Sequence, residues 1–370
     1  MLLSSFSEAL SYALYILVAI LVLLLMITVH EFGHYIAGKI FGFGIEEFSI
    51  GFGPKIISKK KKNGEIFSVR LLPLGGFCAF KGEDKEDTDS NAFNNKKPWQ
   101  RIIVLISGAL MNYVFAILII GLMFSVYGHT AVMTYEMENS VQAQSEYSFL
   151  ERDVILKVEG KNVYMLTDVM NAIEGREKGE NVVFTILRKG SVQQLNYELK
   201  GDTKFQNIED MEKLCTALGV KYQKGLEENS LTTGFRTTGV KLGLFSTIGR
   251  TFEYSFKVAG SIFLVLGELL TGSLGLNSVG GTVTTISLTA QVVKTGGLWS
   301  LLNIMSFIGV NLAVFNLLPI PALDGSRVFF TIIEWIRRKP INRRVEGIIH
   351  TVGLIAIFLF AIIVDLNHCF

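Results

Sequence analysis

The order of apolar and polar residues divides the chain into long hydrophobic runs separated by polar segments. A helix needs roughly 20 apolar residues to cross the hydrocarbon core of a bilayer. Runs near or above that length lie at residues 10–29, 102–127, 301–318 and 348–364. With their flanking residues they define predicted transmembrane segments at 1–40, 100–127, 299–330 and 348–366. The pattern therefore predicts a polytopic α-helical membrane protein with about four transmembrane helices.

Another apolar run, at residues 258–276, is interrupted by Glu268 and by several glycines. We interpret it as an interfacial or partly embedded helix, with a true span as the alternative. It lies in a segment, residues 206–298, that we assign to an extracytoplasmic and interfacial amphipathic region.

Basic residues gather in two of the polar loops, at residues 41–99 and 331–347. The first loop contains Lys59-Lys60-Lys61-Lys62, and the second contains Arg337-Arg338-Lys339. Because basic residues near span ends resist translocation, both loops are predicted to be cytoplasmic. An even number of spans then places both termini outside, together with the polar region that follows the second span.

Two polar regions show the alternation that is typical of strands. Residues 45–80 predict a β-hairpin with its turn at Asn63-Gly64, lying against the membrane domain. Residues 128–205 predict strand, turn, helix, strand, turn and strand, a size and order that resemble a single PDZ domain. Such domains carry a GLxxGD loop before the strand, whereas residues 148–153 read SFLERD and lack both glycines. The fold class is thus a helical membrane protein with a membrane-associated hairpin and an inserted PDZ-like α+β domain.

Composition agrees with a membrane protein and excludes some functions. The chain of 370 residues is 49% hydrophobic and only 18% charged, with a net charge of +2. No long basic tract is interleaved with aromatic residues, so nucleic-acid binding is not expected. Cys78, Cys215 and Cys369 are far apart, which indicates neither a disulfide framework nor a cysteine zinc knuckle.

The motif HEFGH at the end of the first span is the strongest chemical signal. His30 and His34 are four residues apart, so on a helix they project from one face and can bind one metal ion. Glu31 beside them is placed to act as the general base toward water. The alternative is a pair of structural histidines at the end of a span, but ionisable clusters within spans are usually functional.

A catalytic zinc commonly has three protein ligands, so a third ligand is needed. Ala37 and Ile40 fill the places where soluble HExxH proteases continue their motif. Glu268, Glu334 and Asp365 lie near apolar segments without supporting context. Asp324 differs because Pro319 and Pro321 precede it and break the third span, which lets irregular backbone face a cavity. Its alternative interpretation is a turn aspartate before Gly325.

Three separated motifs together resemble the site-2 protease family. They are HEFGH in the first span, GALMN at residues 108–112 in the second, and NLLPIPALDG at residues 316–325 after the third. The likeness is to bacterial RseP-type enzymes with one PDZ domain, and it extends to FSIGFGP, LPLGGF and VGGTV. Two departures from the family pattern are Ser326 after LDG and Thr282 after the glycine pair, and neither is a proposed ligand.

The resemblance implies a site and a chemistry. It implies one Zn²⁺ ion per chain held by His30, His34 and Asp324, with Glu31 as the general base. It also implies that the hairpin and five further residues handle substrate: Asn112, Asn311, Asn316, Pro319 and Pro321.

The resemblance also implies a function and a location. The expected activity is hydrolysis of peptide bonds within or next to transmembrane segments of single-span proteins or remnant signal peptides, after a first extracytoplasmic cleavage. Such an enzyme is a site-2-type zinc metalloendopeptidase of the bacterial cytoplasmic membrane, with its active site near the cytoplasmic side. Expected partners are substrate transmembrane helices, such as anti-sigma-factor-like proteins or pheromone precursors, and the lipid bilayer. A non-proteolytic zinc-binding scaffold or transporter is the alternative.

Overall fold

The computed structural model describes residues 2–83, 87–137, 147–205, 210–224, 231–272 and 280–369. Parts of the predicted 128–205 and 206–298 regions, and Val279 of VGGTV, lie outside the described residues. The chain forms two compact units, Met1–Gly121 with Ser255–Phe370, and Leu122–Tyr254. We call them the helical unit and the sheet unit and describe each by itself.

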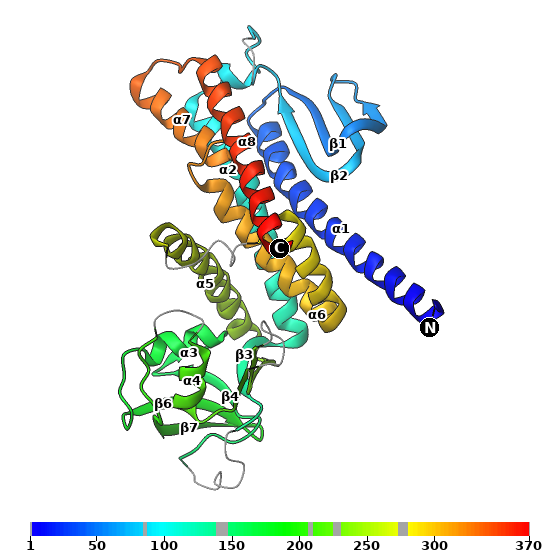
Figure 1. The fold of residues 1–370 in the computed structure, drawn as a ribbon. Coiled ribbons are helices and arrows are strands. Elements are labelled where there is room, and N and C mark those ends of the chain that lie inside the picture. Colours follow the sequence, from blue (N-terminus) through cyan, green and yellow to red (C-terminus); the bar gives the residue numbers. More distant parts are fainter. Residues whose placement is uncertain are drawn as a thin grey trace. The chain divides into compact units, whose positions relative to one another are not determined.

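Long apolar helices make up most of the helical unit (Figure 1). Its helices are α1 (Leu2–Ile40), α2 (Pro98–Tyr127), α6 (Thr282–Leu317), α7 (Asp324–Arg337) and α8 (Arg343–Cys369). Within the described residues, four segments are long and apolar enough to cross a membrane: Leu10–Ile40, Pro98–Tyr127, Gly296–Leu317 and Arg343–Leu366. The predicted number of spans is thereby confirmed. Helix α5 (Leu244–Thr271) is not among them.

Helix α6 is longer than the predicted third span because it includes a polar first half. The backbone leaves helical geometry at Gly297, where φ is 61°. The apolar segment that qualifies as a span begins at Gly296. Thus α6 consists of two helical pieces joined at a kink, and the second piece is the predicted transmembrane helix.

Helix α7 replaces much of the predicted cytoplasmic loop at 331–347. It continues to Arg337, and α8 already begins at Arg343, which leaves only a short connection. The buried positions of α7 include Ser326, Thr331 and Glu334. Its exposed positions include the large apolar residues Phe329, Trp335 and Ile336. Polar residues inside and apolar residues outside are the reverse of the arrangement in a water-exposed helix. The run of basic residues after Ile336 makes this segment look like a cytoplasmic loop in the sequence.

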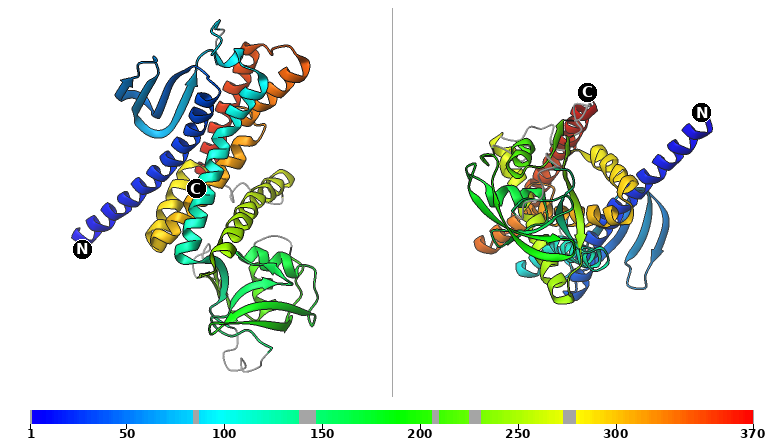
Figure 2. Two further views of the ribbon diagram at one scale, coloured as in Figure 1. Left: turned by 180° about the vertical axis from the view of Figure 1, so that it is seen from behind. Right: turned by 90° about the horizontal axis from the view of Figure 1, so that it is seen from below.

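The predicted hairpin is present as β1 (Ile45–Lys60) and β2 (Ile66–Phe80), which pair antiparallel. The pairing is more elaborate than a simple hairpin, because Glu47 pairs with both Ala79 and Ile66. Folding back in this way makes four short strand segments, in the order 57–60, 66–69, 47–50 and 76–80. Figure 1 and the left view of Figure 2 show this sheet beside the C-terminal part of α1.

A buried carboxylate ties the turn of the hairpin to α1. Glu65 is only 2% exposed and accepts hydrogen bonds from Lys39, Lys61 and Asn63. Burial would raise its pKa, but these donors lower the pKa of Glu65 to about 2. The carboxylate therefore stays charged and holds the turn against the helix that carries HEFGH.

The sheet unit is built around one antiparallel sheet of six strands, ordered β10-β3-β4-β6-β7, with β5 pairing with β4. Its elements are β3 (His129–Thr134), β4 (Val154–Val158), β5 (Lys161–Asn162), α3 (Leu166–Ile173), β6 (Asn181–Arg188), β7 (Ser191–Glu198), α4 (Met211–Leu218), β8 (Tyr222–Lys224), β9 (Leu231–Thr233) and β10 (Phe235–Val240). The predicted order of strand, helix and two strands is found from β4 to β7. Residues of α3, α4 and the sheet share one apolar core around Phe149, Phe184 and Tyr197.

The sheet unit reaches beyond the predicted boundary at residue 205. Strand β10 pairs with β3 in a register that joins Val240 to His129 and Phe235 to Thr134. This pairing closes the unit with a strand far along the sequence, which a pattern of local alternation does not reveal.

His129, the first residue of β3, is buried against the last residue of β10. Its side chain is 1% exposed, and its Nδ1 lies 2.7 Å from the carbonyl oxygen of Val240. Burial lowers the pKa of His129 below its ordinary value of 6.5.

We expect the sheet unit to lose stability as pH falls from about 7.5 to about 5.5, because the unfolded chain binds a proton that folded His129 resists. The measurement is hydrogen exchange at the amides of β3 and β10 in the full chain. His129→Gln should flatten the pH dependence of their protection. Equal pH dependence in the wild type and the variant would contradict this assignment.

Candidate metal centre

The HEFGH motif lies on the buried side of α1, next to α2. His30 and His34 are 8% and 7% exposed and follow one another by one helical turn. The helices approach closely at Gly33, where an added Cβ would overlap the carbonyl oxygen of Ser107 in α2. A glycine is therefore required at this position of the motif, because it lets the histidines reach the interior of the helical unit.

Asp324 joins the two histidines from the far end of the sequence. It is the first residue of α7, after the segment in which Pro319 and Pro321 end α6. Its Oδ2 lies 2.9 Å from His30 Nε2 and 3.2 Å from His34 Nε2, and the two Nε2 atoms are 3.1 Å apart. In the described part of the chain, these three side chains form a group that can hold a metal ion.

The donor set fits zinc. Two imidazole nitrogens and one carboxylate oxygen are a common catalytic zinc set. Ligand bonds near 2.0–2.1 Å in a tetrahedral site separate neighbouring donor atoms by about 3.3 Å. The three observed separations are close to that edge length, and the donors converge on one point rather than on separate hydrogen-bond partners.

Further contacts from α2 orient the histidines. His34 Nδ1 lies 2.8 Å from the carbonyl oxygen of Val104, so its Nδ1–H donates there and Nε2 remains available as a ligand atom. Asn112 is fully buried, with its side-chain amide 3.5 Å from His30 Nδ1 and with no partner for its Oδ1. Exchanging the two ends of this amide would let Oδ1 accept from His30 Nδ1–H and satisfy both groups.

Glu31 and two of the three ligand candidates, His30 and Asp324, line one cavity of about 280 Å³, and the third candidate, His34, contacts both of these ligands without lining it. Its lining residues are Ile27, His30, Glu31, Asn112, Leu312, Asn316, Ala322 and Asp324. The structure thus brings together all four residues of the predicted catalytic and metal set, with two of the predicted substrate residues. Asn311, Pro319 and Pro321 are not among the lining residues. Pro321 instead packs against Gly353 of α8.

The sheet formed by β1 and β2 also reaches this site. Gly76 lies against Glu31 and Ile27, at the start of the outer strand segment 76–80. Among the described pairings, this segment is paired on one side only, with residues 45–50. An unpaired strand edge therefore runs next to the carboxylate that is placed to act as a base.

Two residues that support the site were not predicted for that role. Val104 acts through its backbone carbonyl, which has no signature in a sequence. Gly108, the first residue of GALMN, lies where an added Cβ would overlap the ring of His34. Its place in the motif was a usable signal, because a glycine in a helix often marks a close approach.

Comparisons with known proteins agree with this geometry. The family model of peptidase family M50 matches residues 18–360. A protein of Clostridium perfringens whose name places it among the zinc metalloproteases is 33% identical over 357 residues, covering 96% of this chain and 98% of the relative. Zinc metalloprotease RasP of Bacillus licheniformis is 28% identical, and the regulator of sigma-W protease RasP of Bacillus subtilis is 27% identical. Each of these two alignments covers 92% of this chain and 95% of the relative.

A family match over nearly the whole chain, with its zinc-type donor set assembled inside four apolar helices, leads to one conclusion: the chain belongs to peptidase family M50, the site-2 protease family of membrane zinc metalloproteases.

Proposed function

We propose that the chain cleaves peptide bonds within or next to transmembrane segments of single-span membrane proteins or remnant signal peptides. The observation that carries this proposal is the cavity in which Glu31 meets the donor atoms of His30 and Asp324. Because these groups lie on α1 and directly after α6, the peptide bond must come to the apolar helices to be cut.

In the mechanism, His30, His34 and Asp324 would hold the zinc ion, which would supply the Lewis acidity needed to polarise the scissile carbonyl group. The Glu31 carboxylate accepts a proton from the attacking water and returns it to the leaving amine. The Nδ1–H of His34 donates a hydrogen bond to the carbonyl oxygen of Val104, and this hydrogen bond fixes the orientation of the imidazole ring during the reaction. Asn316, and the end of the Asn112 amide that does not face His30, offer hydrogen-bonding groups to the substrate backbone.

A substrate helix hides its peptide groups in its own hydrogen bonds, so it must unwind before it is cut. The outer strand segment 76–80 supports a way to do this, because its unpaired edge can take up the freed backbone groups as an added strand. The edge runs beside Glu31, so a bound strand would lie next to the base.

We further propose the arrangement in the membrane. The basic loops favour a cytoplasmic position for the hairpin and for the active-site end of α1, with both termini and the sheet unit outside. The sheet unit would act as a PDZ-like docking or size-filtering module that admits substrates already trimmed by a first cleavage. Its segment 148–153 is held by Arg188, which bonds Asp153 and the carbonyl of Ser148, so this loop is already engaged by the protein itself.

Removing Asp324 should remove the metal. Asp324→Ala leaves only two histidine ligands, so we expect zinc in the purified protein to fall from one ion per chain to a small fraction of that. Elemental analysis together with the melting temperature checks this. Asp365→Ala offers a control at a carboxylate that bonds the start of α6 instead. Full zinc occupancy without Asp324 would rule out the proposed ligand set.

Removing the base should stop catalysis while the metal stays bound. For Glu31→Gln we expect zinc content and folding to be retained, and cleavage of a reconstituted single-span substrate to fall by about 10²–10⁴-fold. Undiminished cleavage would exclude Glu31 as the base. A chain that binds zinc but cuts no substrate even as wild type would favour the scaffold or transporter alternative.

Gly108 should matter although it has no functional group. A side chain in Gly108→Val would intrude on His34, so we expect zinc affinity to fall by roughly 10–100-fold. Gly260→Ala is a matched control, because an added Cβ there meets open space. Competition with a zinc chelator measures both variants, and equal affinities would show that α2 does not shape the site.

A further inference from the structure

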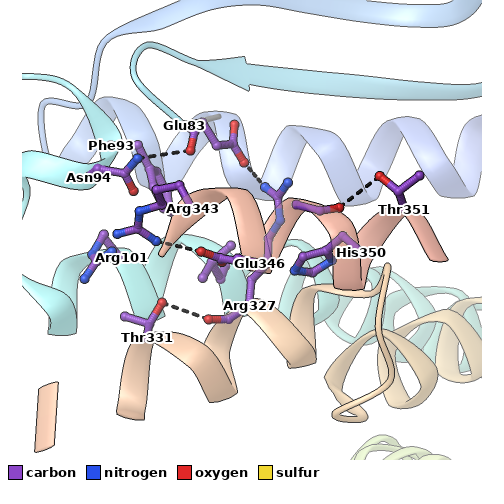
Figure 3. A pocket seen from close by; sticks show the side chains of 12 residues that line it. Glu83, Phe93, Asn94, Arg101, Arg327, Thr331, Arg343, Glu346, His350 and Thr351 are labelled. Carbon is purple, nitrogen blue, oxygen red and sulfur yellow. Dashed lines mark hydrogen bonds and ion pairs between the residues drawn. The ribbon is translucent and has the colours of Figure 1, made fainter. Parts of the chain in front are cut away.

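The helical unit contains a second cavity, of about 370 Å³, that shares no lining residue with the metal centre. It lies where the first turns of α2 and α8 meet α7 and the connector after β2. Figure 3 shows side chains from all of these segments directed around it. The cavity plays no part in the mechanism described above.

Its position corresponds to the boundary of a membrane. Two of the candidate spans, Pro98–Tyr127 and Arg343–Leu366, begin at the cavity. Helix α7 covers it with a polar face and turns Phe329, Trp335 and Ile336 outward. Tryptophan and basic residues next to apolar side chains are typical of the level at which lipid head groups lie. A bilayer crossed by these candidate spans would have its head groups at the level of the cavity.

One arginine of the lining keeps a hydrogen-bond donor that an anion could use. The cavity is lined by three arginines and two glutamates, and the buried Glu334 also pairs with Arg101 and Arg343. Arg101 is 5% exposed, and its buried Nε–H has no hydrogen-bond partner, although its Nη2 bonds Glu334. An unsatisfied guanidinium N–H at a cavity is a donor that an oxyanion would accept.

The remaining charges hold the arginines in place. Glu83 pairs with Arg327, and Glu346 accepts a hydrogen bond of 2.7 Å from Arg343 (Figure 3). The N-termini of α2 and α8 add partial positive charge at the same level. Guanidinium groups bind phosphate oxygens well, because their fork of N–H donors matches the phosphate geometry.

We propose that this cavity binds a phosphate group, and that a phospholipid head group of the surrounding leaflet supplies it. The inference does not rest on the proposed proteolytic function.

The test uses the purified full chain in detergent, freed of lipid and examined by native mass spectrometry. Phosphatidylglycerol is added in one series, and diacylglycerol with the same acyl chains in another. We expect one phosphatidylglycerol to bind saturably, with affinity about tenfold or more above that of diacylglycerol. Equal binding of the two lipids would overturn the proposal. Inorganic phosphate forms the third series and identifies the source of the group. If it alone binds, the lipid source is overturned.

Gly347 gives a variant that blocks the cavity without removing a charge. It lines the cavity on α8, and an added Cβ there meets open space, so Gly347→Leu should fold normally. We expect it to lower phosphatidylglycerol affinity about tenfold or more. Arg338→Gln, at an exposed arginine beyond the end of α7, is the matched control and should bind as the wild type does. Undiminished binding by Gly347→Leu, or an equal loss in Arg338→Gln, would overturn the proposal.

Glu83→Gln separates a binding site from a purely structural ion-pair cluster. The change removes a lining carboxylate and leaves Arg327 in place, so we expect stronger binding of phosphatidylglycerol. Arg327→Gln should weaken it. If both variants lower the melting temperature alike and neither changes lipid binding, the cluster is structural and the proposal is wrong.

Discussion

The close approach of α1 and α2 is the constraint on which the rest of this structure depends. Polar side chains in an apolar helix are costly unless partners satisfy them. Gly33 and Gly108 let the two helices come near enough for the carbonyl oxygen of Val104 to accept a hydrogen bond from the Nδ1–H of His34. That contact leaves His34 Nε2 directed toward Asp324, beside His30 Nε2, so the backbone spacing of two helices helps to determine the chemistry of three side chains.

The position of Asp324 depends on charges as well as packing. It begins α7, whose buried face carries Glu334 in a salt bridge of 2.7 Å with Arg101 of α2. Both side chains are nearly inaccessible to solvent. Removing one partner would leave a buried, unpaired charge, and this would cost far more stability than the intact ion pair contributes. Arg327, one turn after Asp324, pairs with Glu83 after β2. These ion pairs attach α7 to α2 and to the sheet, so the third ligand is fixed from two sides.

Much of this organisation could be predicted from the sequence, for physical reasons that differ between elements. The spans could be predicted because a helix that crosses a bilayer needs a minimum length of apolar residues. The histidine pair could be predicted because residues four apart project from the same face of a helix. Asp324 needed the two other family motifs, since one carboxylate after a proline-rich turn is ambiguous. Helix α7 was missed because its apolar residues face outward and a run of basic residues follows directly after them. The double pairing of Glu47 and the pairing of β10 with β3 depend on contacts distant in sequence, which local patterns do not encode.

The unpaired edge of the segment 76–80 has a consequence for selectivity. Every residue except proline presents the same N–H and C=O groups to such an edge, so recognition there is almost indifferent to side chains. In the proposed cleavage reaction, what then distinguishes one substrate transmembrane helix from another is the free energy needed to fray it. Glycine and β-branched residues lower that cost, and long runs of leucine or alanine raise it. An enzyme built in this way would measure the local stability of a helix rather than read its sequence.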